Sequence, residues 1–316
     1  MRLIIRKLVQ LVLVLLVVSF SSYVLLSALP GDPAVSILGV SATPAAMKIE
    51  HHKLGLDKPL IVQYVRYMQH AFSWNFGRSY LNTQPISQGL SQRLPVTLEL
   101  LILSQLIAFA VAIPAGILAA RKPDGIFDVA SSGTAFTFLA LPSYVLAVFM
   151  VYLFAVKYHL FPATGYTPLT KNPVENLKSM VLQVITLALP EFAAYLRLLR
   201  TDMLATLQED YITLAKSKGM SERFILLRHA LRPSMFSVVT VAGLNFGRLL
   251  SGTLIVEIVF ALPGISQWTV QSIFAKDYIV VQGTVLLITF GYVFFNFLVD
   301  LIYPVLDPRT RYAAAV

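Results

Sequence analysis

The stretch from Glu209 to Pro233, EDYITLAKSKGMSERFILLRHALRP, is a basic, polar segment between long hydrophobic runs. In its first half, Tyr211 and Ala215 lie at helical spacing. Gly219 stands where a helix would end in a left-handed turn, and a second amphipathic piece follows until Pro233. We predict two short helices joined at the glycine, lying flat between two membrane spans and suited to dock a soluble partner. An ordinary basic loop without a partner is the alternative, and the segment alone leaves both open.

The composition indicates a membrane protein. Of 316 residues, 57% are hydrophobic and 13% are charged, and the mean hydropathy is +0.72, whereas soluble domains carry about 25% charged residues. The formal net charge of +9 is compatible with nucleic-acid binding. The basic residues flank the apolar runs, however, as topology signals do, so no nucleic-acid partner is expected. With no cysteine and five scattered histidines, neither a metal site nor a bound cofactor is expected.

Six apolar runs are long enough to cross the roughly 30 Å hydrocarbon core of a bilayer. They predict an all-α polytopic membrane protein that forms one transmembrane domain over residues 1–316. The first run, 8–29, follows Arg2, Arg6 and Lys7 and has a poor cleavage site, so it is interpreted as an uncleaved span. The other spans are expected near residues 95–120, 129–156, 180–199, 235–260 and 282–305.

The later spans are expected to form a five-helix core over residues 96–305, with the loop 209–233 inside it. Residues 30–95 form a long polar region in which Leu60, Tyr64 and Met68 predict an amphipathic helix, lying on the membrane or on the spans. Residues 306–316 form a tail.

The positive charges predict the orientation of these spans. The side of the membrane that holds the N-terminus, the 209–233 loop and the C-terminus has 14 Lys and Arg residues in all, and the short loops of the other side have four. The 30–95 region holds six more, but long segments cross the membrane largely regardless of charge. Both termini and the tail are therefore expected in the cytoplasm, and residues 30–95 outside it.

Two other classes of membrane protein are disfavoured. A channel would need a polar pore-lining repeat or a charged ring, and the sequence shows neither. An enzyme would need converging acid, base or nucleophile groups, and no catalytic residue is predicted. The acidic candidates are placed near span ends, where they would pair, cap or snorkel; they are Glu99, Glu191, Glu257 and Asp300. The chain also lacks the GxxxxGK[ST] phosphate loop, so it should not bind ATP itself.

The loop resembles one found in a known family. Ala215, Gly219 and the run 228–231 (RHAL) are similar to the cytoplasmic "EAA" loop of permease subunits in ATP-binding-cassette (ABC) importers, although Thr213 and Leu214 replace the Glu and first Ala of that motif. Ordered segments along the chain resemble the dipeptide/oligopeptide ("B-type") permease subunits. These are residues 30–34 (PGDPA), 54–60 (LGLDKPL), 76–79 (FGRS), 93–100 (RLPVTLEL), 141–143 (LPS), 161–166 (FPATGY), 188–190 (ALP), 260–264 (FALPG) and 306–309 (LDPR).

This resemblance implies a type I ABC importer permease fold with cytoplasmic coupling helices, in the bacterial plasma (inner) membrane. It implies four partners: a second similar permease chain, two cytoplasmic ATPase subunits or domains, and an extracytoplasmic substrate-binding protein, besides membrane lipid. The expected function is to form half of the pathway for di- or oligopeptides and to couple ATP hydrolysis by the partners to alternating access. Import of nickel, glutathione or another small solute by the same architecture is the alternative.

The resemblance also directs attention to six residues of the loop. Contacts with an ATPase subunit are expected at Tyr211, Leu214, Ala215, Phe224 and Leu227, and Gly219 is expected to permit the bend between the helices.

A polar face in the fifth span is the candidate substrate pathway. Asn245, Arg248 and Gly252 share that face, and Arg248 lies roughly 20 Å along the span, where an arginine costs at least ~2.5 kcal/mol. Glu257, nine residues later, points to the opposite side of a straight helix and cannot pair with it. Two interpretations stay open for Arg248. It faces the translocation cavity and binds a substrate carboxylate, or it pairs with an acidic residue of another span or of the second permease chain.

Overall fold

The computed structural model describes residues 2–28 and 32–306, and the regular secondary structure within these ranges is helical apart from one isolated β-bridge between Arg78 and Pro85. Five of the described helices are long and apolar enough to cross a membrane, and one bent helix pair makes a sixth if the pair is counted as one span. The predicted all-α polytopic class is confirmed. The predicted end of the first span at Leu29 and the tail from Asp307 onward lie outside the described residues.

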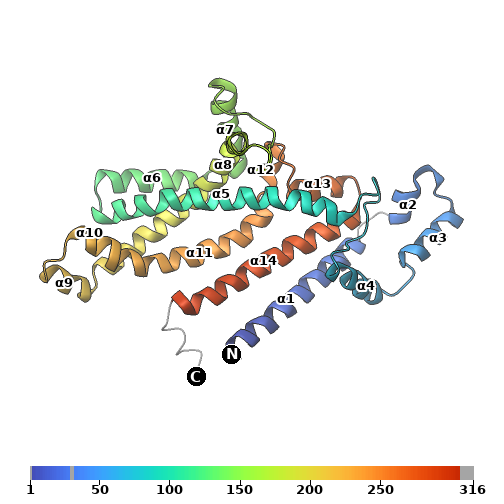
Figure 1. Ribbon diagram of the computed structural model, residues 1–316, viewed down its shortest axis with the longest axis horizontal. Coiled ribbons are helices and arrows are strands. Elements are labelled where there is room, and N and C mark those ends of the chain that lie inside the picture. Colours follow the sequence, from blue (N-terminus) through green and yellow to red (C-terminus); the bar gives the residue numbers. More distant parts are fainter. Residues whose placement is uncertain (1, 29–31, 307–316) are drawn as a thin grey trace. The chain divides into compact units, whose positions relative to one another are not determined.

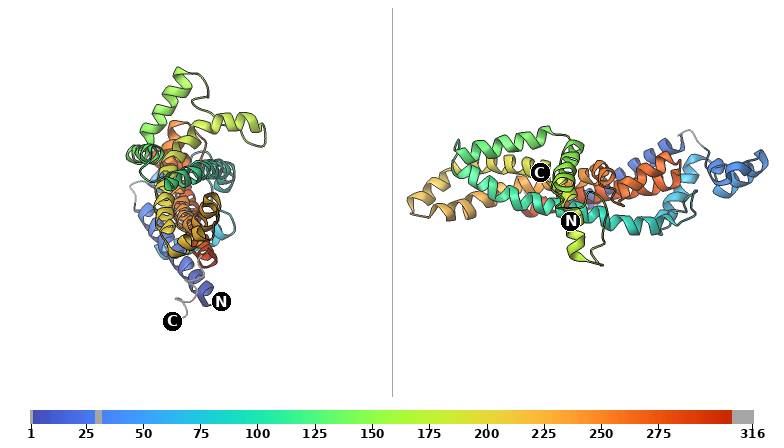
Figure 2. Two further views of the ribbon diagram at one scale, coloured as in Figure 1. Left: turned by 90° about the vertical axis from the view of Figure 1, so that its left-hand side faces the viewer. Right: turned by 90° about the horizontal axis from the view of Figure 1, so that it is seen from above.

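The chain divides into two compact units, residues 1–97 with 263–294 and residues 98–262 with 295–316. The elements of both are drawn in Figures 1 and 2. The first unit contains α1 (Arg2–Ser27), α2 (Pro33–Leu38), a short turn η1 (Gly39–Ser41), α3 (Pro44–Leu54), α4 (Leu60–Phe72), the start of α5 (Ile86–Arg121), α13 (Ile265–Phe274) and the greater part of α14 (Tyr278–Leu306).

The amphipathic helix α4 packs on α1. Tyr64 is buried, and its ring meets the rings of Phe20 and Tyr23 edge-on at centroid distances of 5.1 and 5.7 Å. Its hydroxyl lies 2.7 Å from the hydroxyl of Ser19. Of the predicted apolar stripe, Tyr64 is thus directed at a span, whereas Leu60 is 44% exposed. The contacts of Tyr64 hold α4 against the end of α1 (Figure 1).

The loop between α4 and α5 is fixed at both ends. Phe76 packs in a buried cluster with Ile86, Leu90 and Val280. The carboxylate of Asp277, which is itself buried, accepts hydrogen bonds from the Ser79 hydroxyl and, at 3.2 Å, from the amide of Tyr80. These contacts tie residues 76–80 to the segment between α13 and α14.

The second unit is built around α8 (Pro173–Leu207), which packs against α6 (Ile126–Ala140) and α11 (Leu231–Gly252), as Figure 2 shows for α6. Of the five long apolar helices, α8 is the most buried. Its buried core includes Ala188, Ala193, Tyr195, Leu196, Leu199 and Met203. An ion pair joins the buried Asp128 of α6 to Arg200 of α8, with Nη2 of Arg200 2.6 Å from Oδ2 of Asp128.

The predicted third span, 129–156, is not one straight helix. The helix α6 ends at Ala140, α7 (Ser143–Met150) begins after Pro142 and continues as the π-helical segment η2 (Val151–Lys157), and the pair is bent by 105°. The break follows from Pro142, which lacks an amide hydrogen and disfavours helical backbone in the residue before it. Leu141 is accordingly extended, with φ −83° and ψ 127°.

The predicted fifth span, 235–260, begins and ends differently in the structure. A continuous helix runs from Glu222 to Leu250, so Pro233 does not end the preceding helix. It lies inside this helix just after a π-helical segment, and the carbonyl of His229, which would accept from an amide at 233, accepts from the Tyr211 hydroxyl instead. The far end stops at Gly252, and a short helix α12 (Leu254–Val259) follows.

Candidate functional site

The loop at 209–233 forms a compact helical hairpin. The helix α9 (Asp210–Ser217) is followed by α10 (Glu222–Phe224) and a π-helical segment η3 (Ile225–Ala230), and Figure 1 shows α9 and α10 together beyond the ends of α8 and α11. Gly219 has φ +74°, and the amide of Met220 donates to the carbonyl of Ala215 at 3.2 Å. This is the left-handed helix ending that was predicted at Gly219. The hairpin differs from the prediction in that its second arm runs on into α11.

Apolar side chains fill the interior of the hairpin, and others lie exposed on its surface. Ile212, Ala215 and Ile225 are buried together, with Leu207 against them. Ala215 is therefore part of the interior, and its small side chain lets the two arms approach. The other four predicted contact residues are 45–56% exposed; they are Tyr211, Leu214, Phe224 and Leu227. Large apolar side chains gathered on an otherwise polar loop are typical of a surface that another protein covers.

Tyr211 also has a contact inside the hairpin. Its hydroxyl donates to the carbonyl of His229 at 3.3 Å. That carbonyl is four residues before Pro233, which cannot donate the helical hydrogen bond to it. The side chain of Tyr211 thus ties α9 to the place where the hairpin joins α11.

The hairpin is attached to the end of α5 as well. Nε and Nη2 of Arg121 lie 2.9 and 2.8 Å from the two carboxylate oxygens of Glu222, a bidentate pair. Beside the pair is a cavity of about 450 Å³ whose lining includes Leu207, Met220 and Leu226. The hairpin is therefore connected to α5 by this ion pair and to α11 by the continuous helix.

A second polar cluster lies within the helices of the same unit. Glu191 of α8 is 4% exposed, and its carboxylate accepts from Nδ2 of Asn245 at 2.7 Å and from Nη2 of Arg248 at 3.2 Å. The Arg248 side chain is 69% exposed, so the ion pair joins a buried carboxylate to a largely exposed arginine. Nearby on α8, the Tyr195 hydroxyl donates to Oε1 of Gln105 at 2.9 Å.

The structure thus assembles two of the three predicted pathway residues. Asn245 and Arg248 share Glu191, whereas Gly252 is the last residue of α11 and is not among the described residues that bond to Glu191. Glu257 of α12 is fully buried and accepts from the Thr253 hydroxyl at 3.0 Å. Within the described part of the chain, no group of three or more His, Cys, Asp or Glu side chains is placed to hold a metal ion.

Comparison with known proteins gives the family. Residues 112–312 match the family model described as "Binding-protein-dependent transport system inner membrane component". The chain belongs to this family. Residues 1–101 match the N-terminal model of the same membrane components.

Three relatives resemble the permease over nearly its whole length. A protein of Brucella abortus (strain 2308) named "Putative peptide transport system permease protein" is 40% identical over 310 residues, 98% of this chain and 99% of the relative. The "Probable peptide ABC transporter permease protein" y4tP of Sinorhizobium fredii (strain NBRC 101917 / NGR234) is 35% identical, covering 98% and 99%. The glutathione transport system permease protein GsiC of Shigella flexneri serotype 5b (strain 8401) is 33% identical, covering 98% of each chain.

The permease is therefore a non-catalytic, inner-membrane component of an ABC importer of the peptide-transport type. Membership of a binding-protein-dependent system implies ATPase and substrate-binding partners. Its relatives include a glutathione permease, so the family leaves the individual solute open.

Sequence reasoning missed Glu191 as the centre of the permease's polar cluster. It was placed near a span end, but α8 extends from Pro173 to Leu207 and Glu191 lies at its middle. Glu99 is likewise inside α5, where it accepts from the Tyr166 hydroxyl at 2.7 Å; the side chain of Asp300 lies outside the described part. The available signal was a carboxylate within a long apolar run, which marks a paired or functional group.

Proposed function

We propose that the chain pairs with a second, homologous permease chain, forms half of a translocation pathway for di- or oligopeptides, and couples ATP hydrolysis by two cytoplasmic ATPase subunits to alternating access. The termini and the hairpin at 209–233 would lie in the cytoplasm, and residues 30–95 outside. The observation that carries this proposal is the hairpin's exposed apolar surface, built on a hydrophobic interior and continuous with α11.

The hairpin would be the coupling element. Tyr211, Leu214, Phe224 and Leu227 would enter a groove on one ATPase subunit, because they are, with Met220, the large apolar side chains that the hairpin leaves exposed. Ala215 would act indirectly by allowing the arms to pack. Closure of the ATPase dimer would then move the hairpin as a body, and the continuous helix from Glu222 to Leu250 would carry that movement into the membrane.

Copurification tests this surface. Leu214→Asp or Leu227→Asp, made in the coexpressed importer, should release the ATPase subunits while the permease still inserts, because a charge would be buried in the contact. Leu169→Asp is the matched control, since Leu169 is similarly exposed but lies in the connector after η2. Normal retention of the ATPases by both hairpin variants would refute the assignment.

The solute is proposed to be a peptide. The similarity to two proteins named for peptide transport supports it, and the similarity to a glutathione permease supports a second candidate. Uptake of a labelled di- or tripeptide by the reconstituted importer, in competition with glutathione and with nickel, separates these solutes. Strong inhibition by glutathione and none by unlabelled peptides would favour the second candidate.

Asn245, Arg248 and Gly252 would line the pathway. The Arg248 side chain is 69% exposed although it pairs with Glu191, so the guanidinium is accessible to a passing carboxylate. In this proposal Glu191 is the positioning residue that holds the guanidinium, and the two interpretations of Arg248 become parts of one arrangement.

A further inference from the structure

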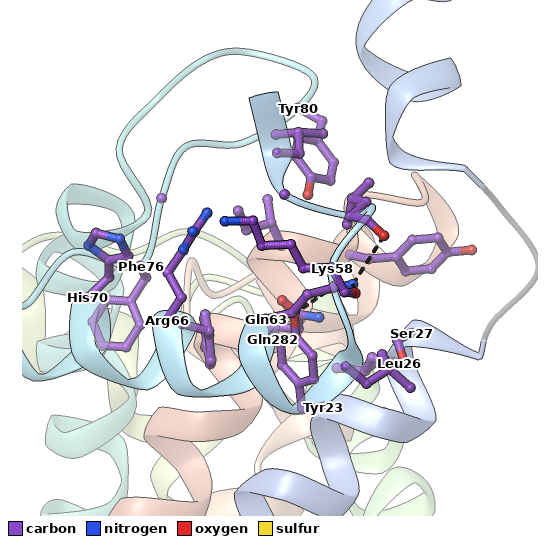
Figure 3. A pocket seen from close by; sticks show the side chains of 18 of the residues that line it. Tyr23, Leu26, Ser27, Lys58, Gln63, Arg66, His70, Phe76, Tyr80 and Gln282 are labelled. Carbon is purple, nitrogen blue, oxygen red and sulfur yellow. Dashed lines mark hydrogen bonds between the residues drawn. The ribbon is translucent and has the colours of Figure 1, made fainter. Parts of the chain in front are cut away.

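The first unit contains a cavity of about 920 Å³, within the range of small-molecule sites (Figure 3). One wall is a face of α4 whose residues recur at helical spacing, and the floor is formed by the end of α1 and the start of α14. The lining residues on α4 are Leu60, Gln63, Arg66, Tyr67 and His70. This face adjoins the one that packs Tyr64 against α1, since Tyr67 also contacts Tyr23 at a centroid distance of 5.6 Å.

The turn that leads into α4 is fixed in place by Gln63. Its Nε2 donates to the carbonyls of Lys58 at 2.7 Å and Leu56 at 3.2 Å, and its Oε1 accepts from the Tyr23 hydroxyl at 3.3 Å. Gly55, with φ +70°, begins the turn, and a Cβ there would be 2.9 Å from Nη1 of Arg66. The left-handed backbone at position 55 favours glycine, and the guanidinium of Arg66 lies against it.

This arrangement directs two cations into one space. Figure 3 shows the side chains of Lys58 and Arg66 extending into the same part of the cavity, between His70 and Tyr80. Neither forms an ion pair with any carboxylate that the structure describes. Two like charges held in one cavity repel each other, and an anion bound between them relieves that repulsion.

The acidic residue of the lining, Asp32, is already engaged. Its two carboxylate oxygens lie 2.7 and 2.8 Å from Nε2 of His51, and Oδ1 accepts from the amide of Ala34 at 2.9 Å. Partial burial raises the pKa of Asp32, but the hydrogen bonds from His51 and Ala34 outweigh it and hold the pKa below its usual value. Asp32 therefore stays ionised near neutral pH and does not neutralise Lys58 or Arg66 directly.

The rest of the lining suits an amphipathic ligand. Aromatic side chains provide apolar contact without fixing one ligand shape, and amide side chains offer donors and acceptors. These residues are Tyr23, Tyr67, Phe76, Tyr80 and Tyr278, with Asn75 and Gln282.

We propose that this cavity binds the C-terminal carboxylate of a short peptide through Lys58 and Arg66, before the peptide reaches the pathway beside Arg248. The carboxylate accepts from both cations, and the apolar side chains of the peptide lie on the aromatic walls. The identification of the ligand as a peptide rests on the proposed function.

Binding to the assembled importer tests the proposal. The complex of permease chains and ATPases, in phosphatidylcholine nanodiscs without ATP or binding protein, is titrated with trialanine and with trialanine amide by saturation-transfer NMR. The free acid should bind about tenfold tighter than the amide, since the loss of a charge-assisted contact changes affinity by about this factor. Lys58→Gln and Arg66→Gln should each weaken binding of the acid and leave binding of the amide unchanged.

Lys48→Gln is the matched control, because Lys48 is an exposed cation of α3 outside the cavity lining; it should behave as wild type. Equal binding of acid and amide, no binding of either, or wild-type affinity in both cavity variants overturns the proposal. The titration is then repeated with phosphatidylglycerol in the nanodiscs. If this lipid displaces the acid from wild type but has no effect in the two cavity variants, a lipid phosphate is the occupant, and the proposal is overturned.

Uptake of trialanine by the complete importer is measured in parallel. Uptake without acid preference refutes only the cavity, whereas no uptake of any peptide refutes the proposed function.

Discussion

Removal of the Arg248 guanidinium tests whether the polar cluster is an energetic unit. Arg248→Gln leaves the buried carboxylate of Glu191 with its hydrogen bond from Asn245 but without the charge 3.2 Å away. At that separation two unit charges attract by roughly 5 kcal/mol at an effective dielectric constant of 20 and by roughly 1.3 kcal/mol in water. Because the Arg248 side chain is 69% exposed, we expect a cost nearer the lower value, about 2 kcal/mol.

The reverse substitution should cost less. Glu191→Gln preserves an acceptor for Asn245 and leaves the guanidinium largely hydrated, so about 1 kcal/mol is expected. In the double variant the carboxylate that needed Arg248 is gone, and the second change should add little. The predicted coupling between the two positions is therefore about −1.5 kcal/mol.

Equilibrium unfolding of the purified permease in mixed micelles measures this cycle, with Arg121→Gln and Glu222→Gln as the control pair. Arg121 and Glu222 are both exposed, so a smaller coupling is expected there. Effects of the Glu191 and Arg248 changes that add within about 0.3–0.5 kcal/mol would refute the coupling.

Uptake by the same variants tests the pathway role. Loss of peptide uptake in Arg248→Gln, with normal assembly and basal ATPase activity, favours a residue that meets the substrate. A complex that fails to assemble favours a purely structural ion pair, and unchanged uptake ends the functional assignment of Arg248.

Three further predictions concern the hairpin, the orientation of the chain and the first unit. Gly219→Val should uncouple ATP hydrolysis from transport or release the ATPases. A Cβ at Gly219 meets no atom within 4 Å, so the cost is the roughly 1 kcal/mol of a left-handed non-glycine backbone, plus the effect of a side chain at the contact. Gly165→Val is the control, since Gly165 is equally open at φ +106°, and it should retain coupling. Full transport in Gly219→Val would contradict the role of Gly219. Cysteines introduced singly at Ser221 and Thr83 of this cysteine-free chain should differ in labelling by an impermeant thiol reagent in intact cells, with only Thr83→Cys reacting; the reverse pattern would invert the topology. The lowered pKa of Asp32 means that its contact with His51 contributes stability above the usual aspartate pKa of about 3.9, and this contribution is lost as pH falls through the folded pKa. Hydrogen exchange of α2, corrected for the intrinsic pH dependence, should therefore increase in acid in wild type but not in Asp32→Asn, and identical profiles would disprove the contribution.

The sequence by itself determined the membrane class, the approximate spans and the hairpin turn. These follow from local properties: the length of an apolar run relative to the bilayer, and the backbone conformation that glycine tolerates at Gly219. The same local rules failed where proline has two outcomes. Pro142 breaks a helix and Pro233 is accommodated inside one, because at the second site the Tyr211 hydroxyl donates to the His229 carbonyl in place of the amide hydrogen that proline lacks.

Only the tertiary structure decided which side chains meet. Tyr211, Leu214 and Ala215 belong to one predicted contact set, yet Ala215 is buried because Ile212 and Ile225 close over it. Glu191 precedes Arg248 by 57 residues, and the packing of α8 on α11 brings the two within 3.2 Å. Lys58 and Arg66 enter one cavity because Gln63 fixes the turn before α4. Periodicity describes one helix at a time, whereas these groups depend on contacts between elements that the local pattern does not encode.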